Sequence, residues 1–310
     1  MQEKGHKEQL RSSIAKALLY SDIFSYPLTA NEILQRLSTN HTSLDEIQDT
    51  LGAMKNDGTV FQFDEYFALR NEQDLALRRN TGNELARNVL PRALRRGRLL
   101  YAFPFIRAVM IAGSLSKNYM DNDSDVDYFV ITEPGRLWVS RFLVALFKRL
   151  FFFNSRKMFC VNYYIDYEHL EIEEKNIFTA TELATLILVC GGQYYERLMQ
   201  QNQWLMEYFP NYIQPAPDER TLRGPLLKRL LEITINPIGD WLDTVTFRLA
   251  SRRYIRLYGH MFSKEDFNVA FKSRKDVSKN HNQHFQKHIT ELYNSKVERF
   301  VNDRPKHAVS

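Results

Sequence analysis

The chain has 310 residues with a formal net charge of +5, of which 44% are hydrophobic and 25% charged. This ordinary globular composition excludes a fibrous or wholly disordered chain, and the length predicts two or three domains. Two cysteines are too few for a disulfide framework, and the polar first residues lack the apolar core of a signal peptide, so we expect a cytoplasmic protein.

The segment 12–70 has the element order of a winged helix, with three short helices followed by a hairpin. The first helix is expected at 14–24, where apolar residues recur at helical spacing. Two capping boxes, Thr29 with Glu32 and Ser43 with Glu46, predict the starts of the next two helices. The Asp57-Gly58 turn and two short aromatic runs predict the hairpin.

Carboxylates near the start of the third helix, where a winged helix would meet DNA, argue against groove reading. Asp45, Glu46 and Asp49 would repel a polyanion, and only Lys55 lies on that helix to compensate. We therefore favour a module that docks against protein or shapes a site, with a winged-helix DNA-binding regulator as the alternative.

The middle of the chain alternates helical and strand patterns. Residues 72–103 are rich in arginine and predict one or two helices, interrupted at Pro91 and Gly97. Strand-like runs follow at 108–112, 125–132 and 157–166. The apolar window 137–153 contains three basic residues, so we expect a buried helix there and no membrane partner.

The chain from residue 179 onward predicts helices and carries the basic excess. From Arg220 to the end there are 18 Lys and Arg against 9 Asp and Glu, a charge of +9, while the remainder carries −4. This segment is a possible nucleic-acid contact, since a basic surface suits a polyanion. Its basic clusters are Arg252, Arg253 and Arg256, and then Lys272, Arg274, Lys275 and Lys279.

One stretch carries a pattern typical of phosphate chemistry. With a period of two, Asp125 and Asp127 point to the same face of the predicted strand, where they repel each other unless a cation neutralises them. Mg²⁺ prefers such oxygen ligands together with substrate phosphates. Upstream, the Gly113-Ser114 turn follows an apolar strand, and Lys117 adds a positive charge that can meet the same anion.

The segment GSLSKNYMDNDSDVDYFVI, with ten residues between Gly113-Ser114 and Asp125-x-Asp127, resembles the nucleotidyltransferase superfamily, whose fold is that of the polymerase β catalytic domain. The resemblance covers about residues 105–170. It implies a small mixed sheet flanked by helices, and two Mg²⁺ ions at Asp125 and Asp127. It also implies that Gly113 and Ser114 bind the β- and γ-phosphates of a nucleoside triphosphate such as ATP, and that an acceptor hydroxyl attacks the α-phosphorus and expels pyrophosphate.

The family usually adds a third carboxylate from a neighbouring strand. Alternate residues of a strand share one face, and this alternation along 157–166 favours Asp166 as that catalytic and metal-binding residue. Asn162 lies in the middle of that strand, where a catalytic carboxylate is expected. The alternative to an enzyme is therefore a catalytically weak or inactive nucleotide sensor or interaction protein. The acceptor is open: protein, nucleic acid or a small molecule.

The expected fold class is α+β, and three domains are expected along the chain. Residues 1–72 form the winged-helix-like module, residues 73–178 the nucleotidyltransferase catalytic domain with its mixed sheet, and residues 179–310 a helical, basic C-terminal domain.

Overall fold

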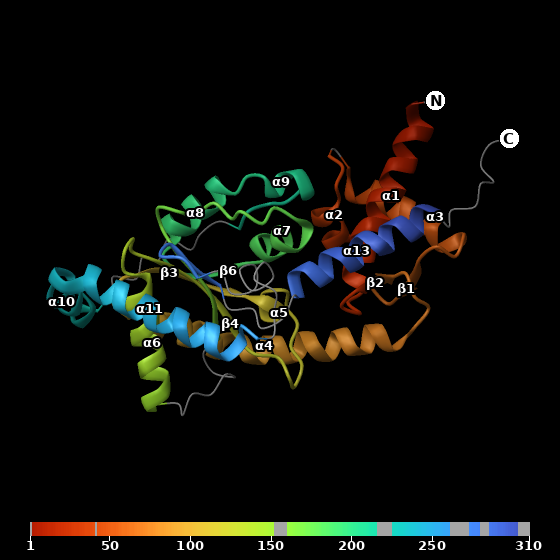
Figure 1. Ribbon diagram of the computed structural model, residues 1–310. Coiled ribbons are helices and arrows are strands. Elements are labelled where there is room, and N and C mark those ends of the chain that lie inside the picture. The colour runs from red at the N-terminus through yellow and green to blue at the C-terminus, as the bar shows by residue number, and fades with distance from the viewer. Residues whose placement is uncertain are drawn as a thin grey trace.

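The computed structural model describes residues 2–40, 42–151, 160–215, 225–260, 273–279 and 285–302. It is an α+β structure with a five-stranded mixed sheet at its centre and a separate two-stranded hairpin near the N-terminus (Figure 1). Among these residues no helix combines the length and the apolar character needed to cross a membrane.

The N-terminal module, residues 2–68, has the predicted order of three helices and a hairpin. Thr29 and Ser43 accept hydrogen bonds from the backbone N–H groups of Glu32 and Glu46, at 3.3 and 3.2 Å, which confirms both capping boxes. A compact core that includes Ile14, Ile33, Ile47 and Leu51 holds the helices together. The elements are α1 (Gln2–Asp22), α2 (Ala30–Arg36), α3 (Leu44–Asn56), β1 (Phe61–Phe63) and β2 (Tyr66–Ala68).

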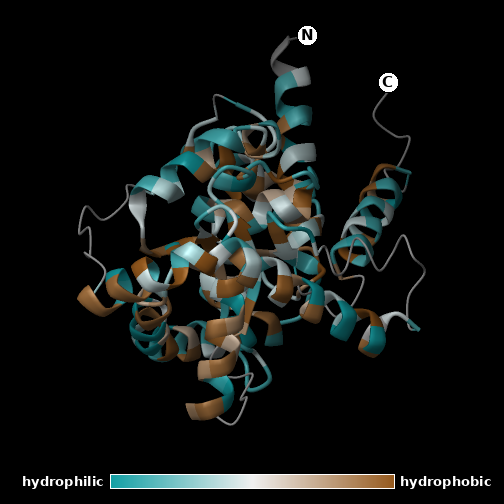
Figure 2. Cartoon of the chain, turned by 60° about the vertical axis from the view of Figure 1, so that its left-hand side comes forward, coloured by the Kyte–Doolittle hydropathy of each residue, from teal (hydrophilic) through white to brown (hydrophobic). Residues whose placement is uncertain are grey.

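Helix α1 is longer than the sequence pattern predicts, because it starts at Gln2 and not near residue 14. Its first turns carry no apolar stripe, and residues 5–9 are exposed. Figure 2 shows this end in hydrophilic colours, projecting from the rest of the molecule. Apolar periodicity therefore locates the buried part of α1 and misses the solvated part.

The central sheet has the strand order β6-β3-β4-β5-β7, in which β4 and β5 are parallel and the other pairs antiparallel. Its strands are β3 (Ile106–Ala112), β4 (Asp127–Thr132), β5 (Cys160–Asp166), β6 (Ile187–Cys190) and β7 (Val277–Lys279).

Among the described residues, the chain after residue 178 is mostly helical, as expected, but it also contributes the two edge strands of the sheet. The run Ile187–Cys190 lies between two helical patterns, and it pairs with β3 as a strand and does not continue a helix. Val277–Lys279 pairs with β5 in the same way. The predicted domain boundary after residue 178 therefore separates β6 and β7 from the other three strands of the same sheet. A short apolar run fits a helix or a buried strand equally well, and the choice here depends on a partner far away in the chain.

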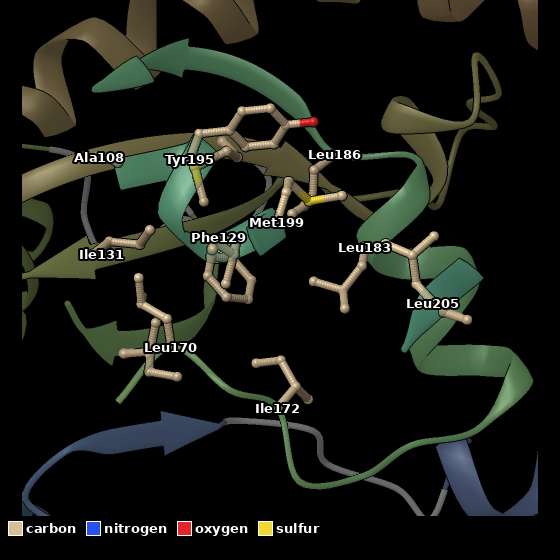
Figure 3. Close-up of a cluster of buried hydrophobic side chains, with 14 of the residues drawn as sticks. Ala108, Phe129, Ile131, Leu170, Ile172, Leu183, Leu186, Tyr195, Met199 and Leu205 are labelled. Carbon is tan, nitrogen blue, oxygen red and sulfur yellow. The ribbon is translucent and has the colours of Figure 1, made fainter. Parts of the chain in front are cut away.

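Helices cover both faces of the sheet. Val109, Tyr128 and Val130 point to one face, against α4 (Asp74–Tyr101), α6 (Leu137–Phe151) and α11 (Gly239–Tyr258). The opposite face packs against the three helices α7 (Ile177–Ala184), α8 (Gly192–Gln201) and α9 (Leu205–Tyr208). Figure 3 shows Phe129 and Ile131 of β4 in this second cluster, close to Leu170, Ile172 and Leu183. The remaining helical elements are α5 (Gly113–Ser116), α10 (Leu226–Ile235), the 3-10 helix Asn236–Ile238 and α13 (Phe285–Asn302).

Helix α4 joins the N-terminal module to the sheet as one 28-residue helix, unbroken at Pro91 and Gly97 (Figure 1). The predicted interruption is wrong. Arg79, only 4% exposed, attaches this helix to the module. Its guanidinium lies 4.3 and 4.2 Å from the ring centres of Tyr26 and Tyr66 and forms a 2.8 Å ion pair with Glu32.

We expect Arg79→Met to lower the free energy of unfolding by about 3 kcal/mol, because it leaves Glu32 without its partner in a partly buried place and removes both ring contacts. Urea denaturation measures the loss. Arg92→Met is the matched control, since Arg92 is an exposed residue of the same helix. Equal stability of the two variants would contradict the role given to Arg79.

Candidate functional site

A cavity of about 600 Å³ lies on the Phe129 face of the sheet, where β3 ends and β4 begins. Its wall combines segments far apart in the sequence: the end of α1, the turn into α5, the beginnings of β4 and β5, α7, and the start of α13. The N-terminal module thus forms part of this cavity, which fits the expectation that the module shapes a site.

The Gly113-Ser114 turn and Asp127 are neighbours on this wall. Ala112, the last residue of β3, pairs with Asp127, the first residue of β4. Gly113 has a φ of +69°, and a Cβ atom at this position would collide with the Asp127 carboxylate. Glycine is therefore required here for its backbone conformation and for the space that it leaves. The structure brings Gly113, Ser114, Lys117 and Asp127 to one cavity.

Asp127 is an ionisable group in an unfavourable position for its charge. Its Oδ1 accepts a 2.5 Å hydrogen bond from Nδ2 of Asn162. Burial raises the pKa of Asp127 to about 7, and the charges of Glu182 and Asp125 contribute to this rise, whereas Lys117 opposes it. The immediate surroundings of Asp127 therefore disfavour its ionised form, chiefly through burial.

Asp125 is placed differently from the prediction. Strand β4 begins at Asp127, so Asp125 precedes the strand and does not share a strand face with Asp127. The reason is that β3 ends at Ala112, the partner of Asp127, and the chain turns away at Gly113. Asp125 is half-buried and close enough to Asp127 to raise its pKa, but it is not part of the cavity wall.

Asp166 lies at the far end of the sheet, which corrects its assignment as a third ligand beside Asp127. In the parallel pair of β4 and β5, Cys160 is opposite Asp127 whereas Asp166 is opposite Thr132. The Asp166 carboxylate is 2% exposed and accepts hydrogen bonds from the backbone N–H groups of Glu168 and His169 at 3.0 and 3.1 Å. It also contacts Nδ1 of His169 at 2.7 Å, a bond that raises the pKa of the imidazole. Its visible role is to close the turn after β5.

Asn162 is the β5 residue whose side chain lies beside Asp127. The register between β4 and β5 shifts so that Val161 pairs with Tyr128 and Tyr163 with Phe129. Asn162 is the additional residue on β5, and the irregularity directs its side chain toward Asp127. A neutral amide therefore stands here.

Glu182 of α7 is the site residue that sequence reasoning missed. Its Oε1 forms a 2.7 Å ion pair with Nζ of Lys117, and its Oε2 accepts a 3.4 Å hydrogen bond from the backbone N–H of Gly113. Nothing in the local pattern of α7 indicates this contact, because it joins residues 65 and 69 positions apart in the chain.

Further basic side chains of the cavity wall come from the N-terminal module, α4 and β7. A guanidinium N–H of Arg36 donates to Oγ of Ser21 at 3.1 Å, and one of Arg78 donates to the carbonyl of Phe24 at 3.1 Å. Lys279, one of the predicted basic residues, is buried at the cavity and donates to Oε1 of Gln286.

The other predicted basic residues lie away from the cavity. Arg274 forms ion pairs with Glu173 and Asp276, both at 2.7 Å. Lys275 donates to Oγ1 of Thr244 at 3.4 Å, and Lys272 is outside the described residues. The three predicted arginines of α11 are exposed: Arg252, Arg253 and Arg256.

Within the part of the chain that the structure describes, no three His, Cys, Asp or Glu side chains are grouped closely enough to form a metal site by themselves. No protein-family model, curated protein or solved structure matches this chain. The site is therefore interpreted from its own geometry.

Proposed function

We propose that this chain is a Mg²⁺-dependent nucleotidyltransferase, which transfers a nucleoside monophosphate from a nucleoside triphosphate to an acceptor hydroxyl and releases pyrophosphate. One observation carries the proposal: the Asp127 carboxylate lies against the Gly113 turn at the wall of a large cavity, in surroundings that raise its pKa to about 7. A buried carboxylate with a raised pKa at the wall of a cavity is typical of a functional site.

The donor set beside the turn fits a hard divalent cation. Carboxylate oxygens are ligands that Mg²⁺ prefers, and a bound cation would favour the ionised form of Asp127, which burial and the nearby carboxylates disfavour. Asp125 and Asp127 would hold Mg²⁺ together with triphosphate oxygens. The resemblance implies two ions, but Asn162 turns its amide nitrogen toward Asp127 and its Oδ1 toward Cys160, so it adds no charged ligand for the second ion.

Each protein group has a defined task in this proposal. The backbone at Gly113, the Ser114 hydroxyl and the Lys117 ammonium bind the β- and γ-phosphates. The cavity orients the acceptor, whose hydroxyl oxygen forms a bond to the α-phosphorus while the bond from that phosphorus to the pyrophosphate oxygen breaks. Mg²⁺ held by Asp125 and Asp127 would lower the pKa of the attacking hydroxyl and would neutralise charge on the leaving pyrophosphate.

A second candidate is a nucleotide sensor of the same construction that binds triphosphate with little or no transfer. Asn162 supports it, because a neutral side chain occupies the position beside Asp127 where a third carboxylate is expected. The contribution of the N-terminal module to the cavity favours both candidates over a DNA-binding regulator, since it gives that module a task at the nucleotide.

Transfer of label from [α-³²P]-labelled triphosphates tests the proposal. The pure protein is incubated with each of the four labelled nucleotides, Mg²⁺ and a cell extract that contains macromolecules and small molecules. We expect label in an acceptor with at least one nucleotide, and at least about a hundredfold less with the double variant Asp125→Ala, Asp127→Ala. Absence of transfer together with retained Mg²⁺-dependent binding would favour the sensor.

A further inference from the structure

We infer that Glu182 is a specificity-determining residue of this site: its carboxylate occupies the anion-binding groups of the free protein, so that the site admits triphosphate accompanied by Mg²⁺ and excludes metal-free anions. The inference rests on the proposed function and concerns how the same site selects its ligand.

The first support is that Glu182 contacts both groups that would receive phosphate. One carboxylate oxygen is 2.7 Å from Nζ of Lys117, and the other is 3.4 Å from the backbone nitrogen of Gly113. Carboxylate and phosphate oxygens require the same donors, so the two anions compete for the same places. Lys117 also donates to the carbonyl of Gly113 at 3.0 Å, which fixes the ammonium against this turn.

The second support is the charge balance of the wall. Glu182 accepts a hydrogen bond from the backbone N–H of Gly113, and the Asp127 carboxylate lies against the same residue, so the two carboxylates are close together. A metal-free anion that entered at the Gly113 turn would meet the carboxylates of Asp127 and Glu182 and a lysine that is already paired. An anion that enters with Mg²⁺ brings positive charge to the carboxylates of the site. Glu182 can then leave Lys117, because the negative charges remain balanced by the cation.

The position of Glu182 allows this exchange. Its side chain is 28% exposed and faces the cavity, so it can turn into solvent without opening the core. It belongs to α7, and two other residues of this helix, Phe178 and Leu183, are buried and hold the helix in place. The contact between Glu182 and Lys117 can therefore break while the surrounding elements stay fixed.

Glu182→Gln tests the inference, because glutamine keeps the size and one acceptor oxygen but removes the charge. The probe is inorganic pyrophosphate in EDTA, titrated by calorimetry into the pure protein, with thermal unfolding as a check of folding. We expect Glu182→Gln to bind metal-free pyrophosphate at least about tenfold more tightly than the unmodified protein, a difference of about 1.4 kcal/mol. Glu182→Ala should show the same gain.

Asp121→Asn is the matched control, since it removes a carboxylate from the same cavity that does not contact Lys117. A gain confined to the Glu182 variants supports the inference, whereas an equal gain in Asp121→Asn, or no gain in either Glu182 variant, overturns it. A parallel titration with ATP and Mg²⁺ separates the two proposals. If the unmodified protein binds Mg²⁺-ATP and Glu182→Gln gains nothing, the inference fails alone; if no Mg²⁺-ATP binds, the proposed function fails.

Discussion

Asp127→Asn is expected to abolish Mg²⁺-dependent nucleotide binding and, at the same time, to stabilise the metal-free protein at pH 8. Asparagine keeps an oxygen that can accept the hydrogen bond from Asn162, but it carries no charge to hold the cation. It also removes the cost of an ionised carboxylate in a buried place that Glu182 and Asp125 make still less favourable.

The sign of this stability change depends on pH. The pKa of Asp127 is raised from 3.8 to about 7 in the folded chain, so between these values the folded state binds more protons than the unfolded state. The stability of the unmodified protein therefore falls as the pH rises through this window, and the full cost, up to about 4 kcal/mol, is present above pH 7.

Urea unfolding in EDTA at pH 5 and pH 8 measures this effect. Asp127→Asn should be more stable than the unmodified protein by a few kcal/mol at pH 8 and by much less at pH 5. Asp123→Asn, which changes an exposed residue of the preceding loop, should show little difference at either pH. A gain in Asp127→Asn that does not depend on pH would contradict the account of the charge.

Gly113→Ala is expected to damage the site and the fold together. The left-handed backbone conformation of Gly113 is less favourable for alanine by about 1–2 kcal/mol. The added Cβ atom would also push against the Asp127 carboxylate. Moving that carboxylate should weaken Mg²⁺-nucleotide binding by at least about tenfold, since such sites depend on sub-ångström placement.

Gly58→Ala separates the two causes. Gly58 has a similar φ of +76°, but nothing lies within 4 Å of the position its Cβ would take. This variant should lose only the backbone cost and keep full nucleotide affinity, whereas Gly113→Ala should lose more stability and most of its affinity. Both are measured by urea unfolding and by nucleotide titration. Equal behaviour of the two variants would show that the contact with Asp127 is unimportant.

Local signals in the sequence predict much of this fold. The capping boxes at Thr29 and Ser43, the hairpin, and the presence of strands at β3, β4 and β5 follow from neighbouring residues, and the structure confirms them. The turn at Gly113 and the carboxylate at Asp127 could also be placed together, because consecutive strands usually pair.

The features of the site that the sequence does not predict depend on strand register and on contacts between residues far apart in the chain. Parity assigns a residue to a strand face but not to an end of the sheet, so Asp166 was expected beside Asp127 although the parallel register separates them. The irregularity that turns Asn162 toward Asp127 leaves no sequence signal. Glu182 reaches Lys117 only because α7 packs against the same face of the sheet.

The most direct test is a calorimetric titration of the unmodified protein with ATP and the other triphosphates, in Mg²⁺ and again in EDTA, at pH 8. Mg²⁺-dependent binding of at least one nucleotide, lost in the double variant Asp125→Ala, Asp127→Ala, is the predicted result. Binding that is the same with and without Mg²⁺, or that persists in the double variant, would contradict a cation held by these two carboxylates.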